Sequence, residues 1–142
     1  MSSKLRSIKR AGERAIGKEA EDSFEVTYQQ LINAMSAGAV AALLNERLPG
    51  RLMQLVRFGK SVTGELELFE EAKKKIIERH DGKLDEQKKV YEFDGNTEAA
   101  DKDFQELLRT TVTIRGPRLT EAELDKTNLV PAQVMMLSWL VE

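Results

Sequence analysis

One long segment without proline most constrains what this chain can fold into. Residues 50–80 contain no proline, and large apolar residues recur there at alternating steps of three and four. That spacing places the apolar residues on one face of a helix. A helix of this length extends about 46 Å, more than a small domain needs. It must therefore project beyond its neighbours, bend near Gly59 or Gly64, or meet a second copy of itself.

The apolar face of this helix also defines a candidate oligomer interface. Its heptad-like spacing is typical of helices that pack against other helices, although Gly59 and Lys73 interrupt it. We therefore predict that a homo-oligomer forms through the large apolar residues of this seam. These are Leu52, Leu55, Val62, Leu66, Phe69 and Ile76.

The second half of the same helix carries the densest group of ionisable residues. Glu70 and Glu71 stand four residues before Lys74 and Lys75, the spacing of ion pairs on an exposed helix face. The only histidine, His80, precedes an Asp-Gly pair, which is typical of a helix end. The histidine follows these glutamates by nine or more positions, so they do not converge on it. We interpret the segment as a solvated helix and not as a carboxylate–histidine active site.

A strand and a second long helix are predicted before it. The residues "FEVT" at 24–27 alternate apolar and polar, a strand signal. Thr27 and Gln30 fit a capping box, in which each side chain satisfies a free backbone N–H at a helix start. This helix is expected to run to about Arg47, because Pro49 and Gly50 then permit a sharp reversal. The two helices would form a long antiparallel pair.

The rest of the chain predicts short alternating elements. Thr120 and Glu123 repeat the capping-box pattern, and Pro131 suits the first position of a closing helix. The fold class is therefore α+β and mainly helical, with two or three short strands and a C-terminal helix, in one domain at 23–142. The expected order is a polar loop at 81–89, a strand at 89–93, a helix from 96 or 97 to 109, a strand at 110–114, a brief helix after 120 and a helix from 131.

The first 22 residues predict a basic arm. Residues 1–18 hold six basic residues and one acidic residue, Glu13, whereas the whole chain has a net charge of −2. Such an arm can bind a protein partner, a neighbouring subunit or its own body, and we favour a protein. Nucleic acid is the alternative, but the arm has no aromatic residue for base stacking. The candidate contact residues are Lys4, Arg6, Lys9, Arg10, Arg14 and Lys18.

The sequence offers little for catalysis. No cysteine is present, and a single histidine excludes the usual zinc sites with paired histidines. The Gly-Lys-Ser at 59–61 lacks the earlier glycine and the strand of a phosphate-binding loop. Aspartates at 81, 85, 94, 101 and 103 do not have calcium-loop spacing. No enzyme activity and no cofactor are expected, and a magnesium enzyme using carboxylates is the lowest-ranked alternative.

The C-terminal residues "VMMLSWLVE" hold more large apolar groups than one helix face can bury. They predict either a helix buried on most sides, which we favour, or a contact surface formed by Met135, Met136 and Trp139, since Trp and Met are typical anchors. The longest run of small apolar residues, 37–44, is far shorter than the ~20 residues of a membrane span. No apolar run follows the basic start, so we expect no secretory signal, no membrane partner and a cytoplasmic location.

Several segments resemble a family of small bacteriophage proteins of unassigned function, often encoded among late, virion-related genes of tailed phages. The resemblance rests on "LLNERLPGRLMQLVRFGKSV", "ELELFEEAKKKIIERH", "KDFQELLRTTVTI" and "LVPAQVMMLSWLVE". It covers 24–142 and leaves out the basic arm. The resemblance assigns no functional residues to this chain.

The resemblance implies a non-enzymatic phage protein that binds other proteins in virion assembly. It would then be found in the host cytoplasm or in the virion. An inhibitor that docks on host machinery, such as RNA polymerase or a defence nuclease, is the alternative. We expect a phage structural protein or a host protein as the partner.

Overall fold

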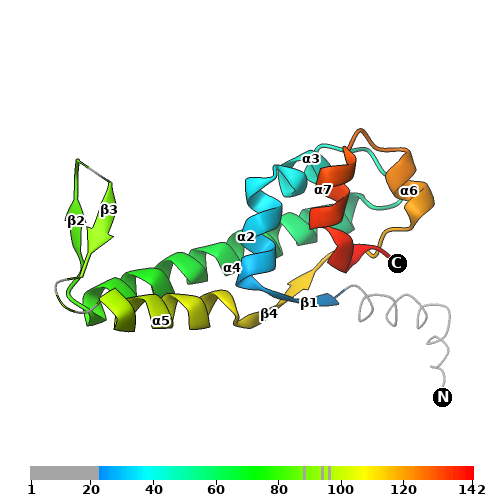
Figure 1. Cartoon of the computed structure of the whole chain (residues 1–142). Helices are drawn as coiled ribbons and strands as arrows, with labels where there is room; N and C mark the ends of the chain where they lie inside the picture. Colours follow the sequence, from blue (N-terminus) through cyan, green and yellow to red (C-terminus); the bar gives the residue numbers. More distant parts are fainter. Residues whose placement is uncertain (1–22, 88, 94, 96) are drawn as a thin grey trace, which may run out of the picture.

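The long helix predicted from the apolar spacing organises the molecule. The computed structural model describes residues 23–87, 89–93, 95 and 97–142. In it, helix α4 spans Leu52–Arg79 and continues through Gly59 and Gly64. Its 28 residues extend about 42 Å. The second half of α4 projects beyond the bulk of the fold (Figure 1), which was the first of the three outcomes considered for a helix of this length.

A two-stranded antiparallel sheet lies against the first half of α4. Strand β1, Ser23–Thr27, pairs with β4, Thr111–Arg115, and places Phe24 opposite Ile114. Phe24 and Val26 alternate with less buried neighbours, so one face of β1 enters the core. Both strands were predicted, but their pairing joins segments more than eighty residues apart and has no local signal.

The helix predicted from Thr27 to Arg47 is divided into two. Helix α2, Tyr28–Ser36, begins at the predicted capping box, where the Gln30 N–H donates to Thr27 Oγ1 at 3.1 Å and the Thr27 N–H donates to Gln30 Oε1 at 2.9 Å. Gly38 then adopts φ +73°, a left-handed conformation that ends a helix. Helix α3, Ala39–Leu44, starts immediately afterwards.

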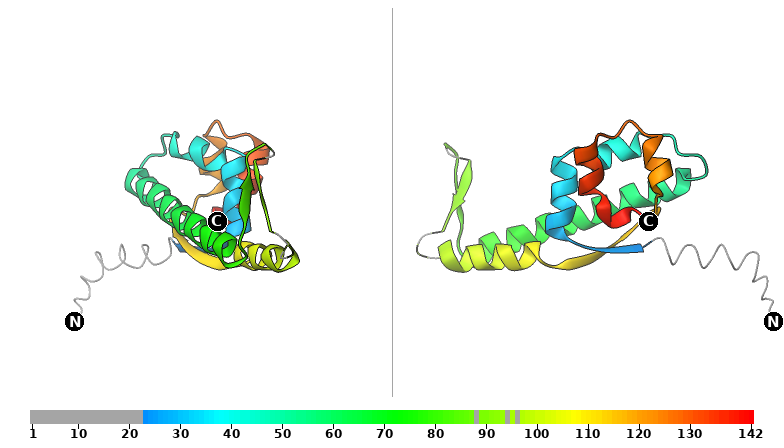
Figure 2. Two further views of the ribbon diagram at one scale, coloured as in Figure 1. Left: turned by 90° about the vertical axis from the view of Figure 1, so that its left-hand side faces the viewer. Right: turned by 45° about the vertical axis from the view of Figure 1, so that its right-hand side comes forward.

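The C-terminal elements cover the same half of α4. Helices α6, Glu121–Asp125, and α7, Pro131–Met136, are followed by a short 3-10 helix, η1, at Ser138–Leu140. Together with α2 and α3 they gather over the first half of α4 (Figures 1 and 2). We call residues 23–64 and 109–142 the head. Its core cluster includes Phe24, Val26, Leu31, Leu43, Phe58, Ile114, Leu119, Leu137 and Leu140.

The remaining described residues, which lie within 65–108, form what we call the stalk. Helix α5, Thr97–Leu108, runs antiparallel to the second half of α4 (Figure 1). Between these helices the chain forms an antiparallel hairpin of β2, Lys83–Asp85, and β3, Val90–Glu92. Strand β3 was predicted, but β2 falls in the segment predicted as a polar loop. Leu84 is the only apolar residue of β2, so nothing in its own sequence indicates a strand.

A hydrogen bond joins head and stalk at their boundary. The hydroxyl of Tyr28, the first residue of α2, donates to Glu65 Oε1 of α4 at 3.0 Å. Burial, together with the neighbouring Glu65 carboxylate, raises the pKa of Tyr28 to about 12. The phenol therefore stays protonated and remains a donor at neutral pH. The predicted fold class, α+β and mainly helical with a long helix, short strands and a C-terminal helix, is confirmed. The predicted pairing of the long helix is corrected: α2 and α3 are short, and the helix that runs antiparallel along α4 is α5 (Figure 1).

Candidate interaction surfaces

The single histidine has a structural partner. His80 Nε2 lies 2.8 Å from Asp103 Oδ2, and Arg79 Nη1 lies 3.2 Å from the same oxygen. The hydrogen bond from His80, with the charge of Arg79, holds the pKa of Asp103 below its usual value. Asp103 belongs to α5, so these contacts tie the end of α4 to α5. Sequence spacing did not identify this partner, because it comes from another helix.

The described residues contain no metal-binding cluster. Nowhere in them do three or more His, Cys, Asp or Glu side chains come together in a way that could hold an ion. Of the five aspartates considered from the sequence, Asp94 lies outside the described residues. None of the described helices combines the length and apolar character that crossing a membrane requires.

The apolar seam of α4 packs inside the molecule. Leu55, Val62, Phe69 and Ile76 are buried, and Leu66 packs against the head core. Of the six predicted oligomer residues, Leu52 alone is largely accessible, with 73% of its surface exposed. The other five have partners within their own chain and are not free to meet a second copy in this arrangement.

The start of α4 presents an exposed apolar surface instead. Leu52, Met53 and Val56 are exposed, and their spacing makes them neighbours on the helix. We call these three residues the helix-start surface. A groove of about 370 Å³ lies beside it, lined by Glu46, Arg47, Leu48, Pro49, Leu52 and Leu55. Met53 and Val56 were missed in the sequence because they lie off the seam.

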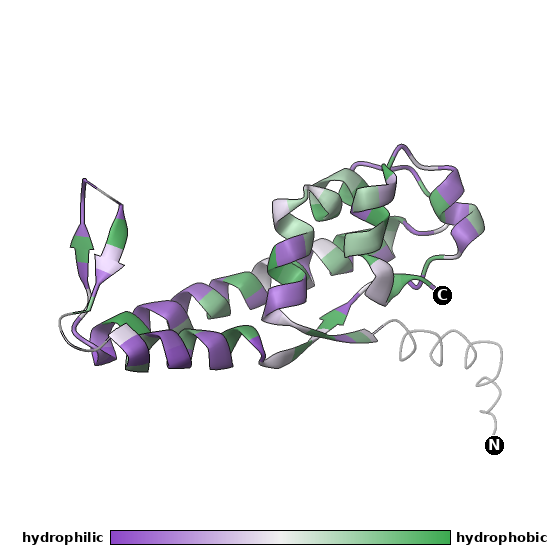
Figure 3. Ribbon diagram, viewed as in Figure 1, coloured by the Kyte–Doolittle hydropathy of each residue, from purple (hydrophilic) through white to green (hydrophobic). Residues whose placement is uncertain are grey.

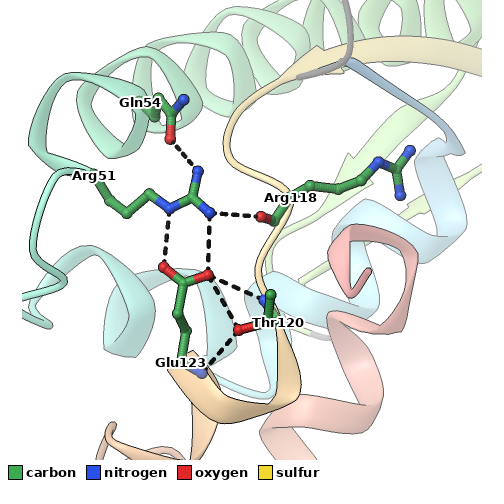
Figure 4. Close-up of polar contacts among 5 residues, drawn as sticks. All are labelled: Arg51, Gln54, Arg118, Thr120 and Glu123. Carbon is green, nitrogen blue, oxygen red and sulfur yellow. Dashed lines mark hydrogen bonds and ion pairs between the residues drawn. The ribbon is translucent and has the colours of Figure 1, made fainter. Parts of the chain in front are cut away.

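A network centred on Arg51 fixes the position of this surface (Figure 4). Arg51 Nε and Nη2 donate to the two carboxylate oxygens of Glu123, at 2.9 and 3.0 Å. Arg51 also donates to Gln54 Oε1 at 2.7 Å and to the backbone oxygen of Arg118 at 3.1 Å. The hydrogen bond from Arg51 lowers the pKa of Glu123. The network ties the residue before Leu52 to α6.

Glu123 belongs to the second predicted capping box, which is present. The Glu123 N–H donates to Thr120 Oγ1 at 3.1 Å, and the Thr120 N–H donates to Glu123 Oε1 at the same distance. The Glu123 carboxylate therefore caps α6 and also binds Arg51. The second role could not be predicted, since Arg51 is 72 residues away in sequence.

The hairpin forms a second apolar surface at the far end of the stalk. Leu84, Val90 and Tyr91 are each about half exposed, between 47% and 52%, and we call them the hairpin surface. Leu84 pairs with Tyr91, so these two side chains share one face, and Val90 lies on the other. Figure 3 shows hydrophobic residues on both hairpin strands, beyond stalk helices that carry many hydrophilic residues. The sequence did not single out this surface.

Of the three residues predicted to form a C-terminal contact surface, two are exposed and one packs in the core. Met135 is 71% exposed and Met136 is also exposed, whereas Trp139 packs against the rings of Phe24 and Phe58. We call Met135 and Met136 the C-terminal surface. A groove of about 480 Å³ adjoins Met135; its lining includes Leu124, Leu129 and Val134 and the acidic residues Glu121 and Asp125.

The six basic arm residues lie outside the described residues, so their role stays a prediction. These are Lys4, Arg6, Lys9, Arg10, Arg14 and Lys18. No family model matches the chain, and no curated protein or solved structure is significantly similar to it.

Proposed function

We propose that this chain is a non-enzymatic phage protein that binds other proteins as a component or accessory of virion assembly. The phage context rests on the resemblance of its segments, and the site of action would be the host cytoplasm or the virion. One observation supports a binding role above all others. Large exposed apolar side chains gather at both ends of one long helix, on the helix-start and hairpin surfaces.

Exposed apolar side chains gathered in this way are characteristic of protein-binding sites. Leucine and valine contribute four of these six side chains, and Met53 and Tyr91 are residue types that are enriched at interfaces. A rod with a contact surface at each end suits a protein that joins two others. The C-terminal surface adds a third contact on the head, and the basic arm adds charge that favours an acidic partner.

Affinity capture from infected cells, followed by mass spectrometry, tests this function. The wild-type chain should retain phage structural proteins and should be present in purified virions. Met135→Glu or the pair Leu84→Glu and Tyr91→Glu should remove a specific partner, because a buried unpaired carboxylate opposes binding. Leu68→Glu is the matched control, since Leu68 is exposed on α4 outside all three surfaces. A chain that retains no partner, or that loses every partner equally with Leu68→Glu, contradicts the proposal.

The acidic stalk favours a second candidate function. Residues 65–108 carry fourteen acidic and eight basic residues, and a rod with that excess of negative charge can occupy a basic channel that normally binds nucleic acid. The chain would then inhibit a host enzyme such as RNA polymerase or a defence nuclease. In the same capture experiment this function predicts a host enzyme as the retained partner. Retention should fall steeply with added salt.

A further inference from the structure

We infer that the basic arm, residues 1–22, binds the groove beside Met135 on the head of its own chain. We call this groove the C-terminal groove. Basic arm residues would face its acidic side chains, and apolar arm residues would fill it. This inference goes beyond the proposed function and does not depend on it. It is carried by the chemistry of the groove, the sequence of the arm and the place where the arm joins the head.

The C-terminal groove combines apolar walls with acidic side chains. Its volume is about 480 Å³, and the two acidic residues that line it, Glu121 and Asp125, are both exposed. None of the basic residues that the structure describes lines it. The other lining residues are Thr127 and the apolar residues Leu124, Leu129, Pro131, Val134, Met135 and Val141. A segment that fits this groove therefore carries positive charge beside large apolar side chains.

The sequence of the arm has this composition. Residues 4–10, "KLRSIKR", hold four basic residues, two large apolar residues and no acidic one. Leu5 and Ile8 are three positions apart, a spacing that places two side chains on one face of a helical turn. Further along, Ile16 stands between Arg14 and Lys18. The arm therefore offers apolar side chains flanked by positive charge, as the groove requires.

The four residues that join the arm to β1, "EAED" at 19–22, hold three acidic residues. We assign them to the link and not to the bound segment. Positive charge is available to them at the start of β1, where Arg115 pairs with Ser23 and Arg118 lies over the ring of Phe24. The link can therefore lie beside the head without opposing the contact between the basic segment and the groove.

The start of β1 brings the arm close to the C-terminal groove. The Phe24 ring lies 5.9 Å from the ring of Trp139, and Val141, two residues further along, lines the groove. On the other side, Arg118 Cζ lies 4.9 Å from the Phe24 ring centre, and Glu121 follows three residues later. An extended chain spans up to about 3.5 Å per residue, so both sides of the groove begin within about 10 Å of these contacts. In Figure 1 the start of β1 and the C-terminal end lie on the same side of the head.

A second groove of the head, beside Leu52, does not select a basic segment. Glu46 and Arg47 both line it, so its acidic and basic charges are equal in number. The C-terminal groove is therefore the site that charge favours for the arm. The link also holds the arm near its own groove at an effective concentration in the millimolar range, which favours binding within one chain over binding to a second copy. An acidic partner protein would compete with the groove for the same arm residues.

Paramagnetic broadening of NMR signals tests the inference in the full chain. The chain has no cysteine, so Ser7→Cys provides a single site for a nitroxide label within the basic segment. The label should broaden the amide signals of Leu124, Val134 and Met135, and dilution should leave this effect unchanged because binding occurs within one chain. Raising the ionic strength from about 0.01 M to about 1 M shortens the screening length from about 30 Å to about 3 Å. The broadening should weaken accordingly.

Charge reversal makes the test specific. A groove variant, Glu121→Lys with Asp125→Lys, should lose the broadening, because the basic arm then meets like charge. Glu67→Lys with Glu71→Lys is the matched control and should retain it. This control reverses two acidic residues at the same four-residue spacing on the stalk. All four side chains are exposed, so both variants should keep the circular dichroism of the wild type.

Exchanging the charges between arm and groove should restore the contact. The arm variant carries Arg6→Glu, Lys9→Glu and Arg10→Glu and should lose the broadening when the groove is wild type. Combined with the groove variant, it should regain the broadening, because opposite charges face each other again. The arm variant changes none of the residues that the structure describes. It therefore also serves as the test should the groove variant lose its fold.

Several outcomes would overturn the inference. Groove amides that are unaffected by the label would show that the arm does not bind there. Equal loss of broadening in the groove variant and the stalk control, or no recovery after the exchange of charges, would show that charge pairing does not position the arm. A mixture of isotope-labelled chains without nitroxide and nitroxide-labelled chains without isotope identifies the occupant. Strong broadening in that mixture would show that the arm of a second copy fills the groove, and binding within one chain would be wrong.

Discussion

At the scale of single residues, two glycines differ in what an added methyl group would meet. Gly64 lies inside α4, and apart from its chain neighbours and the backbone of its own helix no atom lies within 4 Å of the position of a Cβ. A Cβ at Gly116 would lie 2.8 Å from Cδ1 and 3.0 Å from Cβ of Phe58. Phe58 is fully buried and cannot give way. Gly64 therefore destabilises its helix, whereas close packing against Phe58 requires a glycine at position 116.

We expect Gly64→Ala to stabilise the protein by about 0.5–1 kcal/mol, because glycine loses more backbone entropy than alanine in a helix interior. Gly116→Ala should destabilise it by about 1–3 kcal/mol through overpacking against Phe58. Urea denaturation of both variants and the wild type measures the change in the free energy of unfolding. Equal effects of the two substitutions would contradict this assignment.

A second residue-scale prediction concerns Glu123. Glu123→Gln keeps an oxygen that can cap α6 but removes the charge that faces Arg51, which should cost about 1 kcal/mol at neutral pH. The folded pKa of Glu123 is lowered from 4.5. The stabilisation is therefore complete above that value and is lost as pH falls through the folded pKa.

The difference between wild type and Glu123→Gln should accordingly stay constant from neutral pH down to about 4.5 and shrink as the pH falls further. Urea denaturation at several pH values measures it. Glu121→Gln is the control, since Glu121 is exposed on the same helix and no ion pair with a described residue involves it. A difference for Glu123→Gln that is constant with pH would show that the charge of Glu123 does not contribute.

At the scale of elements, features that depend on neighbouring residues were predicted well from the sequence, whereas contacts between distant segments were not. Both capping boxes are present and α7 begins at Pro131, because these features depend on residues close in sequence. The break at Gly38 was missed, since a glycine within a helical pattern gives no sign of its φ. The break of the closing helix after Met136, where η1 follows, was also missed, because the apolar spacing of Val134, Leu137 and Leu140 continues across it.

The candidate surfaces were predictable only in part. Apolar spacing identified Leu52, and composition identified Met135 and Met136. Met53 and Val56 lie beside the seam, and the hairpin became visible only when β2 paired with β3. Exposure depends on which neighbours fold over a residue, and that information is not local. For this reason a seam of six residues was predicted where one is largely accessible.

The hairpin leads to an element-scale prediction. The described residues of 83–92 have no buried side chain, and a two-stranded hairpin contributes little stability of its own. Replacing these residues with a short Gly-Ser linker should change the free energy of unfolding by less than about 1 kcal/mol. Phe93 is retained because its ring packs against Phe104.

Thermal and urea denaturation of the linker variant measure this change. A scrambled order of the same ten residues serves as the control for chain length. Loss of cooperative unfolding would mean that the hairpin holds the stalk helices together. In that case the hairpin would not be a free contact surface.

At the scale of the whole molecule, the described core is concentrated in the head. The head cluster contains the fully buried Leu31, Leu43 and Phe58. Phe69, Ile76 and Ala100 are buried in the stalk but do not belong to that cluster. Two regions with unequal cores should open with unequal free energies.

Native-state hydrogen exchange should therefore show two levels of protection, with stalk amides exchanging faster than head amides. Ile76→Ala removes about 2–4 kcal/mol of packing and should accelerate exchange in the stalk while the slowest head amides keep their protection. Leu43→Ala, in the head, should accelerate exchange of the head amides and leave the faster stalk amides unchanged, because the head stays folded while the stalk opens. Uniform acceleration by Ile76→Ala would show that head and stalk unfold as one unit.

The unbroken helix α4 sets the distance between the apolar surfaces at its two ends. Each helical residue adds 1.5 Å of length and about 100° of rotation, so α4 fixes both the spacing and the angle between the groove at its start and the hairpin beyond its end. For proteins bound at the two surfaces, these two quantities are the separation and the relative angle of the bound partners. Adding seven residues to α4 would increase that separation by about 10 Å with little change of angle, whereas adding two would rotate one partner relative to the other by more than half a turn.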